Sequence, residues 1–215
     1  MTALSYCPRC AGALRPPGFW SSAWQCERHG EVLPFHVAPV PSMAAVEKLV
    51  AESRVPVWVP RMLPTGWTVT GVGRAGDDRT GARAALIALS GPAPGGGPAD
   101  VVFVAEEPGI GLGAHFAGIA GTDPGDCPDG AADVKIEAAG HPTALWRTAT
   151  GEGRSTLAGE AKGVWLWCVT WPEQAAGVLD KVALHDLRDG ALPEIELVFG
   201  AQSPRIAVGG AAAEL

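Results

Sequence analysis

The feature that most constrains this chain is a pair of short metal-ligand motifs near its N-terminus. The first is Cys7-x-x-Cys10, and the second, after fifteen intervening residues, is Cys26-x-x-His29. Structural zinc is held by four Cys or His ligands at tetrahedral angles, and a short turn can aim two ligands at one point. Since four protein ligands fill the coordination sphere, none is left open for water. The spacing therefore predicts a structural zinc site in a zinc ribbon of the β-hairpin type, over residues 1–40.

The residues beside these ligands are typical of such turns. Pro8 restricts φ inside the first turn. Gly12 and Gly30 follow the last ligand of each turn, where we expect a positive φ. A module of about 40 residues is usually too small to fold on a core of its own. A bound metal would supply the missing stability.

Other readings of the ligand residues compete with this one. Cys7 and Cys10 could form a redox pair, but no strand of a βαβ unit precedes them, as thioredoxin-like use requires. Haem attachment needs His directly after the second Cys, and that position is Ala11. A rubredoxin-like iron site stays open, although a His ligand favours zinc. His36 also stays open as an alternative to His29, because it lies only seven residues further along.

Composition limits the class of protein. The chain has 215 residues, of which 47% are hydrophobic and 18% charged, enough for a packed core. The formal net charge of −7 disfavours a nucleic-acid partner. No apolar run approaches the ~18 residues of a membrane-spanning helix, and the N-terminus lacks the pattern of a secretory signal. We expect a cytoplasmic protein with no membrane or nucleic-acid partner.

The remainder of the chain predicts an α+β fold. Residues 34–42 contain three prolines and predict a linker. Ser42 is a candidate N-cap for a linker helix in segment 41–54, with the helix itself at 43–54. Hairpin-type spacing and few helices then predict a mainly antiparallel sheet with one or two helices over 55–200, and a flexible tail over 201–215. The expected strands are 67–74, 82–90, 100–105, 133–139, 143–149, 163–171, 181–187 and 194–199, with a short helix at 173–180.

The strand at 163–171 is the clearest of these. Trp165, Trp167 and Trp171 lie on one face, since side chains alternate along a strand. Leu166 and Cys168 lie on the other, so both faces are apolar. The pattern predicts a central strand covered on both sides, with the tryptophans in the core and not in an exposed stacking platform.

Residues 106–132 predict a Gly-rich loop without periodicity. The segment 109–114 matches G-x-G-x-x-A, but carboxylates precede it and we expect no helix after it, so we expect no dinucleotide site. The aspartate spacing in the loop also differs from that of a calcium loop. If a small molecule binds this protein, we expect Glu106, Glu107 and His115 to contact it.

Several segments together resemble a family of uncharacterised actinobacterial proteins with an N-terminal zinc ribbon. The resemblance spans nearly the whole chain and implies no activity, because that family is one of unknown function. The matching segments are 7–10, 15–18, 20–24, 29–34, 105–109 and 159–163.

Two functions remain in view. The first is a non-catalytic protein that mediates protein–protein interaction or regulation, because the metal site is closed and no nucleophile, base and oxyanion donor assemble from the sequence. The alternative is a small-molecule-binding protein or enzyme that uses the 106–132 loop. The first predicts an unidentified protein partner, and the second predicts a ligand held by the loop.

Overall fold

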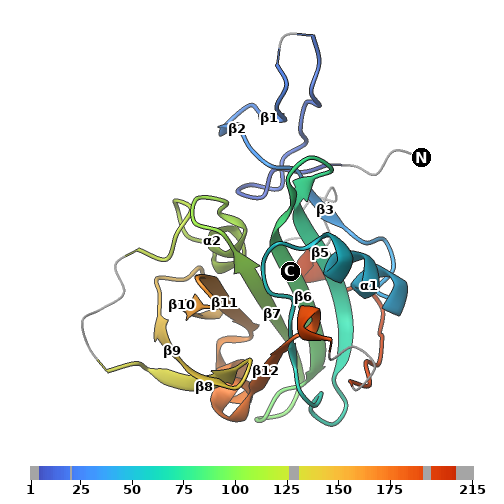
Figure 1. Ribbon diagram of the computed structural model, residues 1–215. Coiled ribbons are helices and arrows are strands. Elements are labelled where there is room, and N and C mark those ends of the chain that lie inside the picture. Colours follow the sequence, from blue (N-terminus) through green and yellow to red (C-terminus); the bar gives the residue numbers. More distant parts are fainter. Residues whose placement is uncertain (1–4, 20, 126–130, 191–194, 207–215) are drawn as a thin grey trace.

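The computed structural model describes residues 5–19, 21–125, 131–190 and 195–206. It is built mostly of β-strands with few helices, which confirms the predicted α+β class (Figure 1). Its strands are β1 (Gln25–Cys26), β2 (Gly30–Glu31), β3 (Phe35–Val37), β4 (Trp58–Pro60), β5 (Thr68–Asp77), β6 (Gly81–Pro92), β7 (Pro98–Glu106), β8 (Val134–Ala138), β9 (His141–Arg147), β10 (Ser155–Ala161), β11 (Val164–Trp171) and β12 (Ala183–Asp186). Its helices are α1 (Met43–Glu52), α2 (Leu112–Ala117) and the 3-10 helices η1 (Glu173–Lys181), η2 (Leu187–Asp189) and η4 (Pro204–Ile206).

Ten of the strands form one sheet in the order β3-β5-β6-β7-β11-β10-β9-β8-β12-β4. Every neighbouring pair is antiparallel except β8 and β12, which are parallel. The last strand, β4, also contacts β6 and β7, so the sheet curls back on itself. The two short strands β1 and β2 form a separate hairpin in the N-terminal module, defined as residues 5–33. This module stands out from one end of the curved sheet (Figure 1).

The curved sheet is apolar on both faces. The inner face packs against α1, whose Val46 and Leu49 are buried, and against η1. The outer face is covered by α2, by Phe35 and by the C-terminal Ile206. Strand β11 lies between them in the middle of the sheet, with Trp167 and Cys168 fully buried. The predicted central strand with a core tryptophan stripe is therefore confirmed, although Trp165 is only half-buried.

Helix α1 begins and ends close to its predicted bounds. The hydroxyl of Ser42 accepts a hydrogen bond from the backbone N–H of Ala45 at 3.3 Å, as an N-cap does. The helix ends at Glu52, two residues before the predicted end, and its buried side starts the main core. Among the described residues, neither this helix nor any other is long and apolar enough to cross a membrane.

Four sequence-based expectations are wrong. The expected linker 34–42 contains β3, because Phe35 packs under the sheet and its strand pairs with β5. Helix α2 interrupts the expected loop 106–132. The expected strand 194–199 is reduced, within the described residues, to one bridge between Val69 and Phe199. The expected flexible tail is anchored at Ser203 and Ile206, which are buried; residues 207–215 lie outside the described part of the chain.

Close strand packing at Gly159 leads to a testable prediction. A Cβ added there would lie 2.2 Å from the carbonyl oxygen of Ala144 on the neighbouring strand β9. Backbone cannot move aside cheaply, so Gly159→Ala is expected to lower the free energy of unfolding by about 1–3 kcal/mol. Urea denaturation followed by tryptophan fluorescence measures this. Gly95→Ala is the control, because a Cβ there meets nothing within 4 Å; equal effects of the two changes would contradict the prediction.

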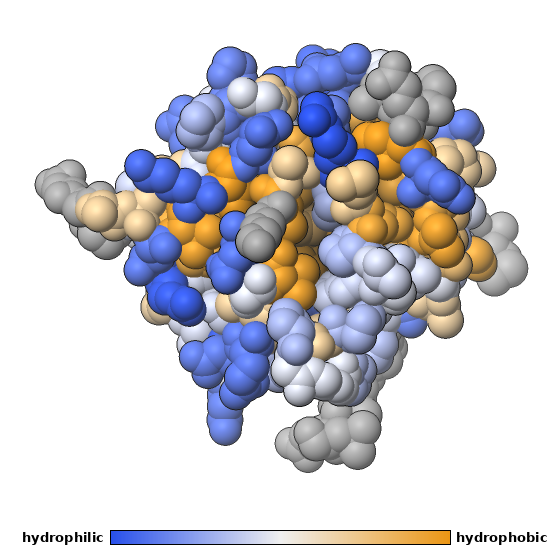
Figure 2. All heavy atoms as spheres, turned by 90° about the horizontal axis from the view of Figure 1, so that it is seen from below, coloured by the Kyte–Doolittle hydropathy of each residue, from blue (hydrophilic) through white to orange (hydrophobic). Residues whose placement is uncertain are grey.

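The end of the sheet opposite the N-terminal module also exposes apolar residues. Figure 2 shows them as a band across this face, interrupted by hydrophilic residues. Apolar atoms contribute much of any protein surface, so such a band is not by itself a site.

Candidate metal centre

The four predicted ligands come together at one point of the N-terminal module. The Nδ1 atom of His29 lies 3.4 Å from Sγ of Cys7 and 3.6 Å from Sγ of Cys26. The Sγ atoms of Cys10 and Cys26 are 3.8 Å apart. All four ligand atoms lie within 4.8 Å of one another. Ligands at zinc-like bond lengths of ~2.0–2.3 Å in a tetrahedron would be ~3.3–3.8 Å apart, so this donor set fits a metal ion of that kind.

His29, and not His36, completes the cluster. His29 follows Cys26 in the second turn, next to the β1–β2 hairpin, and is exposed. His36 lies on β3 instead, where its ring meets the ring of Trp24 edge-on at 6.5 Å. The sequence signal that identifies the fourth ligand is therefore the equal spacing of the two turns, with two residues between the ligands of each. The position of His36 only seven residues after His29 does not make it a ligand.

Backbone hydrogen bonds close the first turn, and a positive φ follows the ligands in both turns. The N–H of Ala11 donates to the carbonyl of Cys7, and the N–H of Cys7 donates to the carbonyl of Gly12, both at 2.8 Å. The expected positive φ after the first turn occurs at Ala11 (52°) and not at Gly12. Gly12 serves a different need, since a Cβ there would lie 3.3 Å from Sγ of Cys10. Gly30 adopts the expected positive φ of 67°.

The thiols are held in unequal environments. Burial raises the pKa of Cys7 to about 12, and the neighbouring thiols add to this against an opposing hydrogen bond from the Arg9 backbone. Burial also acts to raise the pKa of Cys26, but backbone N–H groups of Arg28 and His29 outweigh it and lower that pKa to about 6. A cation at the centre would favour the thiolate form of every sulfur ligand.

The N-terminal module is fastened to the sheet at two places. Tyr6 pairs with Phe35 of β3 through two backbone hydrogen bonds of 3.0 and 2.7 Å. Arg9, inside the first ligand turn, donates from Nη2 to the carbonyl of Gly109 at 2.7 Å and from Nε to that of Ile110 at 3.2 Å. The module therefore rests directly on the Gly-rich loop after β7.

The three residues predicted for a ligand loop engage different partners within the protein. Glu106 is fully buried and accepts the backbone N–H groups of Leu112 and Gly113 at 2.7 and 3.1 Å. Glu107 forms an ion pair with Arg83. His115 lies in α2, and burial lowers its pKa. The segment 126–130 of the same loop lies outside the described residues.

Asp123 is a residue of this loop whose role the sequence did not reveal. One oxygen of its carboxylate accepts both the N–H of Gly109 and the indole N–H of Trp165 at 3.0 Å. Together with Glu106 it holds the loop on which Arg9 rests. Neither Arg9 nor Asp123 carries a sequence signal beyond charge. Arg9 binds a backbone carbonyl 100 positions away, and Asp123 binds a backbone N–H 14 positions away and the Trp165 indole 42 positions away.

Fold and site define an α+β protein with an N-terminal Cys/His cluster that could bind a metal ion. The chain belongs to a family of unknown function, DUF6758, whose model matches residues 1–206. This confirms the resemblance to an uncharacterised family. Searches of curated proteins and of solved structures found no match.

Proposed function

We propose that this protein is a non-catalytic zinc-ribbon protein of the cytoplasm that binds a protein partner through its N-terminal module. The observation that carries the proposal is the four-ligand cluster at the base of a module that projects from the sheet (Figure 1). A structural ion there would hold the module rigid, so that little conformational entropy is lost on binding. Free thiols at Cys7, Cys10 and Cys26 suit a reducing compartment.

An exposed aromatic residue supports this role. Phe19, between the two ligand turns, is 93% exposed, the largest exposure among the described large apolar side chains. Aromatic residues are frequent anchors in protein interfaces, where they fill pockets of the partner. A rigid module that presents such a residue is suited to recognition.

The alternative, a small-molecule site or enzyme in the 106–132 loop, stays a prediction. Glu106 accepts a backbone N–H group, and Glu107 forms an ion pair with Arg83. Burial lowers the pKa of His115, the third candidate. A thermal-shift screen with metabolites and nucleotides addresses it, because any ligand of the native state must raise the melting temperature.

Metal content is the first test of the proposed function. Elemental analysis of untagged, natively purified protein is expected to give one zinc per chain, whereas iron would indicate an electron-transfer site. His29→Ala should weaken zinc affinity at least about tenfold, because one of four ligands is lost. His141→Ala is the matched control, since His141 is exposed on β9. Full zinc retention by His29→Ala would contradict the ligand set.

Partner recovery is the second test. Affinity purification with wild-type protein is expected to recover specific partners that Cys26→Ser and His29→Ala lose, while His141→Ala retains them. Identical partner sets for all four proteins would rule out a binding role for the metal-stapled module.

A further inference from the structure

Arg9 lies at the junction between the metal cluster and the main body of the protein. It occupies the third position of the first ligand turn, directly before the ligand Cys10. Its guanidinium donates to the backbone carbonyls of Gly109 and Ile110 at 2.7 and 3.2 Å. Hydrogen bonds from a charged donor are stronger than those between neutral groups. One side chain therefore joins a ligand turn to residues 107–111, the segment between β7 and α2, which we call the docking segment.

Further contacts surround Arg9. Its Cγ atom packs so close to Gly111 that a Cβ added to this glycine would lie 3.0 Å away. Burial lowers the pKa of His115 in α2, and a hydrogen bond with the Arg9 backbone opposes that shift, so the imidazole also contacts the ligand turn. The His115 ring meets Phe116 edge-on at 5.3 Å, and Phe116 meets Phe35 at 6.2 Å. The contacts of Arg9 thus continue to β3, where the module has its other attachment.

The N-terminal module has almost no apolar core of its own. Within the described residues, its apolar cluster consists of three ligand cysteines and two aliphatic residues, namely Cys7, Cys10, Cys26, Leu14 and Val32. A module of this size needs a staple in place of a core, and metal binding to such a module is coupled to its folding. Loss of the metal therefore loosens the turn that carries Arg9.

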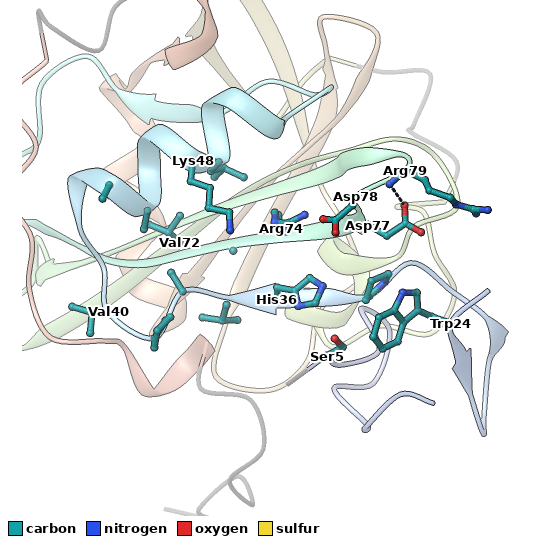
Figure 3. Close-up of a pocket in the computed structure, with 18 of the residues that line it drawn as sticks. Ser5, Trp24, His36, Val40, Lys48, Val72, Arg74, Asp77, Asp78 and Arg79 are labelled. Carbon is teal, nitrogen blue, oxygen red and sulfur yellow. Dashed lines mark hydrogen bonds between the residues drawn. The ribbon is translucent and has the colours of Figure 1, made fainter. Parts of the chain in front are cut away.

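Open space beside the module allows the junction to separate. A groove of about 890 Å³ lies between the module and α1, where Figure 3 shows Trp24 of the module and Lys48 of the helix, so the module does not rest on α1 there. A second cavity, of about 350 Å³, is lined by Arg9, Gly109 and Ile110 among other residues. Both carbonyls belong to half-buried residues. Water can replace the guanidinium there, so release leaves no buried acceptor unpaired.

From these contacts we infer that metal binding at the Cys/His cluster orders the docking segment through Arg9. With the metal bound, the ligand turn holds the guanidinium against the two carbonyls and the segment is docked. Without it, the turn loosens and the segment is released. The coupling is reciprocal, because a docked state that the metal favours must in turn raise the affinity for the metal.

The inference rests on the proposed function, since it requires a metal ion at the cluster. It adds a metal-dependent change outside the module. Metal occupancy then alters the surface of the main body beside the module as well as the module itself, and both lie within reach of one partner.

Hydrogen–deuterium exchange of zinc-loaded proteins, followed by mass spectrometry, tests the inference. Arg9→Ala is expected to speed amide exchange in the docking segment at least about tenfold, because the segment opens more easily once two charge-assisted hydrogen bonds are lost. Arg28→Ala is the matched control. Arg28 occupies the same position of the second ligand turn, directly before His29, and is exposed. It should exchange as wild type does.

Zinc affinity is the reciprocal readout. Competition with a chromophoric chelator is expected to show zinc binding at least about threefold weaker in Arg9→Ala than in Arg28→Ala. Removal of zinc from the wild-type protein under reducing conditions should speed exchange in the docking segment at least about tenfold, and in Arg9→Ala less than about twofold. Equal exchange in zinc-loaded Arg9→Ala and Arg28→Ala, or equal zinc affinities, would overturn the inference.

Failure of the coupling differs from failure of the proposed function. If Arg9→Ala matches Arg28→Ala in exchange, in zinc affinity and in the partners it recovers, the metal site stands and only the coupling is wrong. If the wild-type protein binds no zinc, the proposed function fails and the coupling fails with it.

Discussion

Replacing Asp186 by alanine is expected to lower the free energy of unfolding by about 3–5 kcal/mol. The Asp186 side chain is fully buried. Its carboxylate accepts hydrogen bonds from Nζ of Lys162 at 2.9 Å, from Nη2 of Arg188 at 2.7 Å and from the backbone N–H of Val57 at 3.1 Å. Removal of the carboxylate leaves two cations and a backbone donor without their shared acceptor.

Urea denaturation at neutral pH measures this change, and Asp189→Ala is its matched control. Asp189 also pairs with Lys162, at 2.7 Å, but is 56% exposed, so its removal should cost less than about 1 kcal/mol. A loss below 1 kcal/mol in Asp186→Ala would show that the buried cluster does not stabilise the fold.

The same carboxylate should make the protein sensitive to acid. Burial acts to raise the pKa of Asp186, but hydrogen bonds from Arg188, Lys162 and the Val57 backbone outweigh it and lower the pKa to about 2. Because the folded pKa lies below that of the unfolded chain, near 3.9, the stabilisation is complete above pH 4. It is lost as the pH falls from about 4 through 2.

Glu106 is expected to have the opposite dependence on pH. Burial, and then the charge of Asp123, raise its pKa to about 8, against the hydrogen bonds from the N–H groups of Leu112 and Gly113. The folded protein therefore keeps a proton that the unfolded chain releases above about pH 4.3. Since the unfolded state binds fewer protons over this interval, stability falls as the pH rises from about 4.3 through 8.

Comparison of Glu106→Gln with wild type isolates this effect. Between pH 5 and pH 9 the wild-type protein should lose about 4 kcal/mol of unfolding free energy to this one group. Glu106→Gln cannot titrate and should lack that share of the slope, measured by urea denaturation at both pH values. Glu107→Gln changes the adjacent, partly exposed residue of the Arg83 ion pair and should keep the wild-type slope. Equal slopes in all three proteins would mean that Glu106 does not retain its proton in the folded state.

The predictions for Asp186 and Glu106 both depend on the burial and the hydrogen-bond partners of a carboxylate, about which the sequence held little information. Glu106 and Glu107 are adjacent and look alike as a pair beside a Gly-rich segment. In the structure Glu106, the last residue of β7, is buried under α2, whereas Glu107, the residue after the strand, pairs with Arg83 and is partly exposed. The difference depends on which element covers each face of the sheet.

Local patterns were sufficient for the metal cluster, for helix α1 and for strand β11. The ligand spacing places four donors at one point through two tight turns, each decided by a few adjacent residues. Ser42 caps α1, and Val46 and Leu49 repeat at the helical period. Strand β11 has apolar side chains on both faces, so other elements must cover both faces, whichever elements these are.

Long-range packing decided the rest. The three prolines of residues 34–42 indicate a linker. The segment nevertheless forms strand β3, because the Phe35 ring packs into the core on the outer face of the sheet. Ile206 is held in the core although it lies in an Ala- and Gly-rich tail, since Gly71 leaves space for its side chain. Arg9 fastens the metal module to Gly109 and Ile110 through backbone carbonyls, which every residue has and no sequence pattern marks. The sequence by itself thus determined the short-range features, whose partners lie within a few residues. Only the tertiary structure decided where the metal module rests and what lies beside it, because those contacts join groups far apart along the chain.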